Sequence, residues 1–165
     1  MKIIKQRGFS LPVVMVMMLV LAVMVLAAAQ SFNTESRISS NDADRKMAMQ
    51  VAESALRGGE AKISSLKLSQ FPTVPGCSRE GLCMPGDKNP VWEGSCDSTQ
   101  DSCWESRAVD YVVKPKIPVS RNPKYLIERI GKENDEDILR VTVRAWGENK
   151  NTVVMLQSYV AATLD

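Results

Sequence analysis

Apolar and polar residues divide the chain into three parts. Residues 9–29 carry no charged side chain, and residues 30–68 mix polar and apolar positions. The last third of the chain has short runs rich in β-branched and aromatic residues, separated by turn-forming residues. This order predicts a long N-terminal helix followed by a sheet, which is an α+β fold.

The apolar run at residues 9–29 has the length of a membrane-spanning helix. At about 1.5 Å per residue it extends roughly 30 Å, the thickness of a bilayer core. Lys2, Lys5 and Arg7 precede it and place that end in the cytoplasm. We therefore expect a single-pass anchor in the inner membrane, with residues 30–165 in the periplasm. A plain anchor and a cleaved secretory signal are the alternatives to the leader described below.

Helical periodicity continues after the apolar run. One bent helix is expected from about residue 11 to residue 68, with the bend or a new helix start at residues 39–42. Gly58 and Gly59 weaken it locally and allow close packing. The predicted buried face consists of Met47, Ala48, Val51, Ala52, Ala55, Leu56, Ile63 and Leu66. The predicted solvent face consists of Lys46, Glu53, Arg57, Glu60 and Ser64.

Three strands are expected within residues 124–160. They are predicted at residues 125–130, 138–146 and 152–160, joined by turns at 131–137 and 147–151 into an antiparallel meander. Within the middle strand, one face is predicted to be buried and the other exposed, because the period is two. The predicted buried residues are Leu139, Val141, Val143 and Ala145, alternating with Arg140, Thr142, Arg144 and Trp146.

Residues 71–119 contain six prolines and all four cysteines, and we expect a loop-rich region there rather than a central part of the sheet. Five residues separate Cys77 from Cys83, and six separate Cys96 from Cys103. Structural zinc sites use closer pairs, and an exported domain meets an oxidising compartment, so disulfides are favoured over zinc. Three pairings are possible; the one that closes the smallest loops, Cys77–Cys83 with Cys96–Cys103, is our prediction.

Composition argues against several function classes. The chain has no histidine, which excludes histidine-based catalysis and histidine metal ligation. Without the first eight residues, 18 basic groups face 19 acidic ones, so no specific nucleic-acid binding is indicated. Nothing marks another catalytic arrangement, and we expect no enzyme activity and no cofactor. Trp92, Trp104 and Trp146 are interpreted as core or interface residues, with ligand binding as the alternative.

Residues 5–11 resemble the cleavage site of prepilins. In those proteins a short basic leader ends in glycine and is followed by phenylalanine or methionine, as Gly8 and Phe9 are here. The resemblance implies a leader at residues 1–8, cleavage between Gly8 and Phe9, and N-methylation of Phe9 by the prepilin peptidase. One position departs from the pattern: most pilins carry glutamate five residues after the cut, where this chain has Val13 after Pro12. A subunit with no neighbour above it can dispense with that carboxylate.

The chain also resembles the PilX/PilK-type minor pilins of type IV pilus assembly. The resemblance rests on residues 30–39, 44–46, 52–57, 141–147 and 153–159. It implies a long helix packed on a small antiparallel sheet. It also implies a minor pilin that binds other minor pilins and the major pilin through its N-terminal helix, and that works with the inner-membrane assembly platform. Such a subunit primes the filament at or near its tip. A K-type pseudopilin-like tip subunit of type II secretion and an adhesive tip module are the alternatives.

Overall fold

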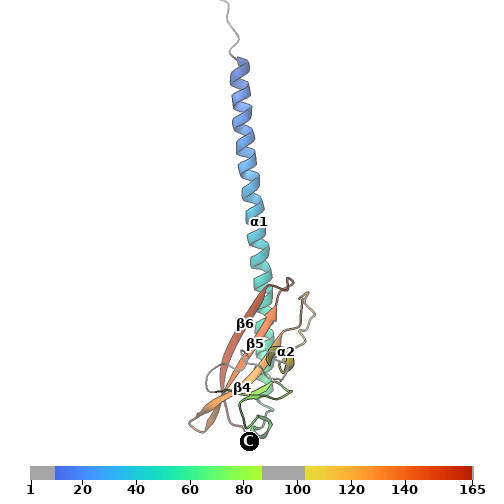
Figure 1. The fold of residues 1–165 in the computed structure, drawn as a ribbon, viewed down its shortest axis with the longest axis vertical. Helices are drawn as coiled ribbons and strands as arrows, with labels where there is room; N and C mark the ends of the chain where they lie inside the picture. Colours follow the sequence, from blue (N-terminus) through green and yellow to red (C-terminus); the bar gives the residue numbers. More distant parts are fainter. Residues whose placement is uncertain (1–9, 87–102, 165) are drawn as a thin grey trace, which may run out of the picture. The chain divides into compact units, whose positions relative to one another are not determined.

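The computed structural model describes residues 10–86 and 103–164, and these divide into two compact units after Asp42. A single helix, α1 (Ser10–Ile63), begins in the first unit and ends in the second (Figure 1). It is followed by the 3-10 turn η1 (Leu68–Gln70) and by α2 (Cys103–Ser106). The strands are β1 (Gly76–Cys77), β2 (Leu82–Met84), β3 (Val109–Asp110), β4 (Lys124–Glu133), β5 (Glu136–Trp146) and β6 (Val153–Ala162).

The second part of α1 buries the face that the sequence predicts. Ala48, Val51, Ala52 and Ala55 have no exposed surface, and Ile63 is 4% exposed. Lys46, Glu53 and Arg57 are exposed on the opposite side. The amphipathic helix is therefore confirmed. Residues 39–42 are helical throughout, so the predicted alternative of a new helix start there is wrong.

The helix ends at Ile63, five residues before the predicted end. Ser64 and Ser65 follow it, and their hydroxyls donate to the carbonyls of Ala61 and Lys62, at 3.0 and 2.8 Å. Serine side chains compete in this way with the backbone hydrogen bonds of a continuing helix. Leu66 nevertheless remains buried, because it packs into the core from the turn.

Gly58 and Gly59 let α1 approach its neighbours closely, as predicted. A Cβ atom on Gly59 would lie 2.7 Å from Cγ1 of Val141 on β5, and one on Gly58 would overlap the ring of Tyr111. No real Cβ atom tolerates such contacts, so both positions need the small residue. The cost of glycine within a helix is offset here by packing.

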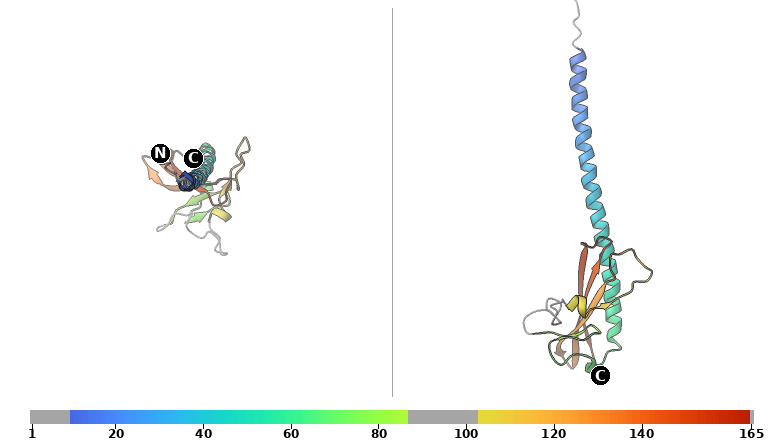
Figure 2. Two further views of the ribbon diagram at one scale, coloured as in Figure 1. Left: turned by 90° about the horizontal axis from the view of Figure 1, so that it is seen from above. Right: turned by 45° about the vertical axis from the view of Figure 1, so that its right-hand side comes forward.

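The predicted meander is confirmed, although the sheet that contains it is larger and mixed. β4 pairs with β5 and β5 with β6, all antiparallel (Figure 2). β2 adds a parallel pairing to β4, β1 pairs with β2, and β3 pairs with β4. The region at residues 71–119, predicted to be loop-rich, thus contributes three short strands to the sheet that the prediction did not include. Strands of two or three residues are too short to show a periodicity in the sequence. Their positions depend on pairing with strands that are distant along the chain.

β4 and β5 are also longer than predicted, because the expected connector at residues 131–137 is mostly strand. The turn consists of Asn134 and Asp135, with φ values of 50° and 68°. Two consecutive residues with positive φ are typical of a tight type I′ hairpin, and asparagine and aspartate tolerate that conformation.

The core lies between the second part of α1 and the inner face of the sheet. The four residues predicted to face inward from β5 are all fully buried. The expectation that the other face of β5 is exposed is wrong at Thr142, which is 0% exposed. Trp146 on the same face is 4% exposed, in agreement with its interpretation as a core or interface residue. A second, smaller cluster covers part of that face and consists of Cys83, Trp104 and Leu126.

Candidate functional site: the helix start and the disulfide hairpin

The predicted cleavage bond between Gly8 and Phe9 lies outside the described residues. Helix α1 begins immediately afterwards, at Ser10. Pro12 occupies its first turn, where the missing N–H group costs no helical hydrogen bond. Any cut at this bond would therefore leave a chain that starts at the beginning of a helix.

Residues 11–30 form an apolar helical segment whose side chains are exposed within their unit. Leu11 is 69% exposed and Val13 is 46% exposed. Of the helices that the structure describes, α1 alone has the length and hydropathy of a membrane span. Such a surface is stable only when lipid or other apolar helices surround it.

Val13 lies one turn into α1 and presents a branched alkyl group. It can neither accept a hydrogen bond nor form an ion pair with an amino terminus. This side of the helix start therefore presents an apolar surface.

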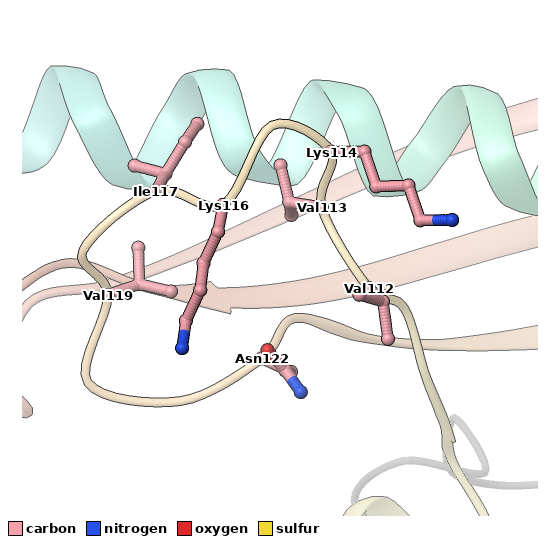
Figure 3. Close-up of a pocket in the computed structure, with 7 residues that line it drawn as sticks. All are labelled: Val112, Val113, Lys114, Lys116, Ile117, Val119 and Asn122. Carbon is pink, nitrogen blue, oxygen red and sulfur yellow. The ribbon is translucent and has the colours of Figure 1, made fainter.

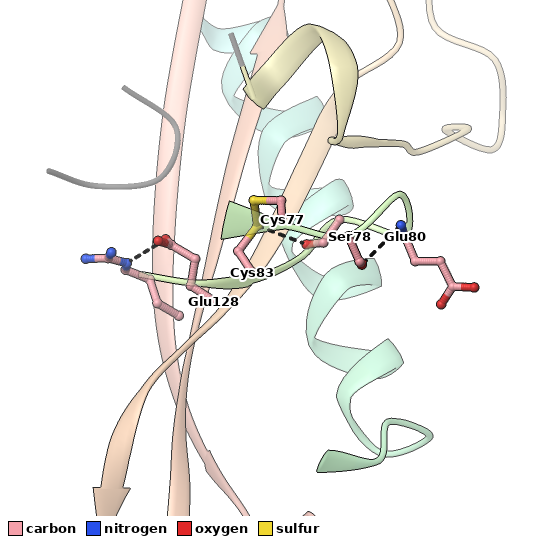
Figure 4. Close-up of a disulfide and its surroundings, with 7 residues drawn as sticks. Cys77, Ser78, Glu80, Cys83 and Glu128 are labelled. Carbon is pink, nitrogen blue, oxygen red and sulfur yellow. Dashed lines mark hydrogen bonds and ion pairs between the residues drawn. A yellow bond between two sulfur atoms is a disulfide. The ribbon is translucent and has the colours of Figure 1, made fainter. Parts of the chain in front are cut away.

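Cys77 and Cys83 form the first predicted disulfide (Figure 4). They face each other directly across β1 and β2, with Cα atoms 4.1 Å apart. The backbone N–H of Ser78 donates to the carbonyl oxygen of Leu82 at 2.8 Å and closes the intervening turn. The disulfide thus staples a small hairpin to the sheet. Cys96 lies outside the described residues, so the predicted Cys96–Cys103 pairing stays a prediction.

A buried ion pair lies beside this hairpin on β4 and β5. Nε of Arg140 donates to Oε2 of Glu128 at 3.0 Å, and Glu128 has no exposed surface (Figure 4). Burial opposes the charge on Arg140, but hydrogen bonds to Glu128 and Tyr159 raise the pKa of its guanidinium overall. Sequence reasoning missed this pair because only the strand register brings the two residues together.

Asp44 joins α1 to the turn between β5 and β6. Its carboxylate accepts from the backbone N–H groups of Glu148 and Asn149, at 2.7 and 3.4 Å. A hydrogen bond from the side chain of Thr152, helped by these two, lowers the pKa of Asp44. Gly147 permits the approach, since a Cβ atom there would overlap the carboxylate. The sequence marked this region only through the polar residues around Asp44.

Two tryptophans that were candidate ligand-binding residues belong to the interior. Trp104 is 3% exposed in the smaller cluster. Trp146 is covered by the guanidinium groups of Arg121 and Arg144, at 5.8 and 5.2 Å from the ring centroid. The core interpretation is confirmed for both, and Trp92 lies outside the described residues.

A pocket of about 420 Å³ opens in the loop between β3 and β4. Its walls include Val113, Ile117 and Val119 (Figure 3). Lys114 and Lys116 also line it, but their side chains point in different directions rather than converging. The arrangement contains no pair of groups suited to acid–base or nucleophilic chemistry. In the described part of the chain, no cluster of three or more cysteine or acidic residues could hold a metal.

Comparison with known proteins gives two matches along the chain. Residues 7–57 match the family model described as PilX N-terminal, and residues 79–162 match that of the type IV pilus assembly protein PilX, C-terminal part. No curated protein and no solved structure matches the chain. The first model covers most of α1, and the second, which spans just over half of the chain, covers β2 to β6 but not β1. The chain therefore belongs to the PilX family of type IV pilus assembly proteins.

Proposed function

We propose that this chain is a minor pilin that primes the type IV pilus at or near its tip together with other minor pilins. It acts as a structural subunit rather than an enzyme. Membership of a pilus assembly family supports the general role and favours a pilus over the type II secretion alternative.

The observation that carries the position in the filament is Val13. In a filament, the carboxylate at this place neutralises the buried amino terminus of a neighbouring subunit. A carboxylate left unpaired in an apolar surrounding costs several kcal/mol. A subunit that starts the filament has no such neighbour, and valine avoids the penalty. The apolar, exposed start of α1 is consistent with this arrangement.

The proposed path begins in the inner membrane. Residues 1–8 are the leader, the segment at 9–29 anchors the chain, and residues 30–165 face the periplasm. The prepilin peptidase cuts between Gly8 and Phe9 and methylates Phe9. The assembly platform then moves the subunit from the bilayer into the pilus, where its N-terminal helix contacts the other minor pilins and the major pilin.

The first test is the N-terminal mass spectrum of the chain, purified from membranes that contain active prepilin peptidase. We expect a chain that begins at methylated Phe9. A chain that still begins at Met1 would reduce the protein to a plain membrane anchor.

The second test separates priming from adhesion. Deletion of the gene should abolish surface pili, and the unmodified chain supplied from a plasmid should restore them. Deletion cells with normal pili that no longer attach to surfaces would contradict priming and support an adhesive tip module instead.

A further inference from the structure

The two ends of the sheet differ in how they are protected. β1, at one end, has two residues and is closed by the Cys77–Cys83 disulfide. β6, at the other end, has ten residues and contains no charged residue, proline or glycine. Within residues 10–86 and 103–164, no strand pairs with its outer side. Proteins usually blunt such edges with charge, proline, bulges or short length, and β6 has none of these devices.

The backbone of β6 is regular along its whole length. Ten consecutive pairs join it to β5 without a register shift, from Asp137↔Ala162 to Trp146↔Val153. β4, by contrast, has an irregularity between Arg129 and Gly131. The outward N–H and C=O groups of β6 therefore form an even row that a further strand can pair with.

Side chains on both faces of β6 suit an added strand. Val154, Leu156, Val160 and Ala162 extend the main core on the inner face. On the outer face, Val153 and Met155 are each 43% exposed and Tyr159 is 61% exposed.

The nearest cations on β5, in register with the outer face of β6, are Arg144, which covers Trp146, and Arg140, which is bound to Glu128. A strand beside β6 would thus contact mainly uncharged groups.

We propose that β6 is an open pairing edge, and that its occupant is an extended, uncharged strand of a different pilin-type subunit. This inference rests on the proposed function, because it assigns an interface to the same assembly. Main-chain hydrogen bonds would provide affinity, and the apolar side chains on the two faces would provide selectivity.

A second copy of this chain fits the edge less well. Asp44 binds the turn that precedes β6, so the chain enters this unit at the end where β6 begins. A symmetric pair of β6 strands is antiparallel, which would put the two entering chains at opposite ends of the pair. Both chains must reach the same bilayer before assembly, which favours a different subunit as the partner.

Site-specific photocrosslinking in piliated cells tests the edge directly. The full chain would carry p-benzoylphenylalanine at Met155 or at Tyr159, with Val74 and Val112 as controls that are 66% and 62% exposed away from β6. We expect light-dependent adducts from the two β6 positions only, recognised by an antibody against another pilin of the same cell. An adduct between two copies of this chain, or no adduct from β6, would overturn the proposal.

A charge placed on the edge provides the matching functional test. Ala161→Lys puts a cation on the exposed side of β6, opposite Ile138, and removes no described hydrogen bond. We expect loss of the adduct from Tyr159 and of surface pili, while Val74→Lys and Val112→Lys keep both. If Ala161→Lys restores full piliation to the deletion strain, the edge proposal fails and priming stands. If deletion itself leaves pili intact, priming fails, and the crosslinks still report on the edge.

Discussion

Helix α1 contains two segments with the same backbone conformation and opposite surroundings. Residues 11–30 are almost uniformly apolar and exposed within their unit. Residues 48–63 alternate between apolar and polar faces and bury the apolar one against the sheet. The apolar segment needs lipid or other helices to cover it, whereas the amphipathic segment packs against the sheet of the same chain.

The comparison shows that helix formation and helix burial have separate causes in this protein. Backbone hydrogen bonds within the helix are satisfied in both segments. What differs is the distribution of apolar surface around the helix axis. Substitutions in the two segments should therefore affect different properties, folding in one and membrane insertion or assembly in the other.

The largest contrast is expected from a new carboxylate. Val51→Asp buries an unpaired charge in the core and should destabilise the folded domain by about 3–5 kcal/mol. Val20→Asp lies in the apolar segment and should leave the domain folded, but should oppose membrane insertion by about 3 kcal/mol. The stability of the domain is measured by unfolding the detergent-solubilised chain and following the fluorescence of the buried tryptophans. Membrane insertion is measured separately, by membrane fractionation of cells that produce each variant.

The result that would break this contrast is a similar loss of domain stability in both variants. That result would mean that the apolar segment contributes to the folding of the domain itself.

A smaller contrast is expected from added volume. Ala55 is fully buried, so Ala55→Leu should overpack the core and cost about 1–3 kcal/mol. Ala27→Leu is the matched control on the exposed apolar segment, and its effect on unfolding should be near zero. Because both changes exchange the same residues within a helix, differences in helix propensity cancel. Equal unfolding midpoints for the two variants would contradict the assignment of Ala55 to the core.

The smallest effect is expected at Asp44, which lies on α1 just before the amphipathic segment and binds the turn between β5 and β6. A lowered pKa means that the folded state favours the carboxylate, so this stabilisation is present above about pH 4 and is lost as pH falls below it. Asp44→Asn should lower the melting temperature slightly at pH 7. The difference from the unmodified chain should shrink below pH 4. A difference that grows towards acid pH would contradict the inferred direction of the pKa shift.

Local periodicity was sufficient to predict most of the fold. The buried face of α1, the three long strands and the inward residues of β5 all follow from spacings of 3.6 or 2 residues. The predictions failed where a structure depended on distant partners. β1, β2 and β3 are too short to show a periodic pattern. The turn between β4 and β5 consists of only Asn134 and Asp135, whereas the composition of residues 131–137 predicted a longer connector.

The candidate site divides in the same way. The predicted Cys77–Cys83 disulfide follows from the short loop between two cysteines, and the structure contains it. The ion pair of Glu128 with Arg140 and the anchoring of Asp44 to residues of a turn more than a hundred positions away had no local signal. Both depend on the register and packing of the sheet.

The sequence by itself determined the apolar segment, the amphipathic helix, the meander and the motif around Gly8 and Phe9, because each is a property of neighbouring residues. Only the tertiary structure decided that the sheet is mixed, which polar residues it buries, and that it ends on one side in the uncharged edge of β6. Strand order and edge exposure depend on pairings between distant segments. The free energies of these pairings cannot be derived from the pattern of neighbouring residues.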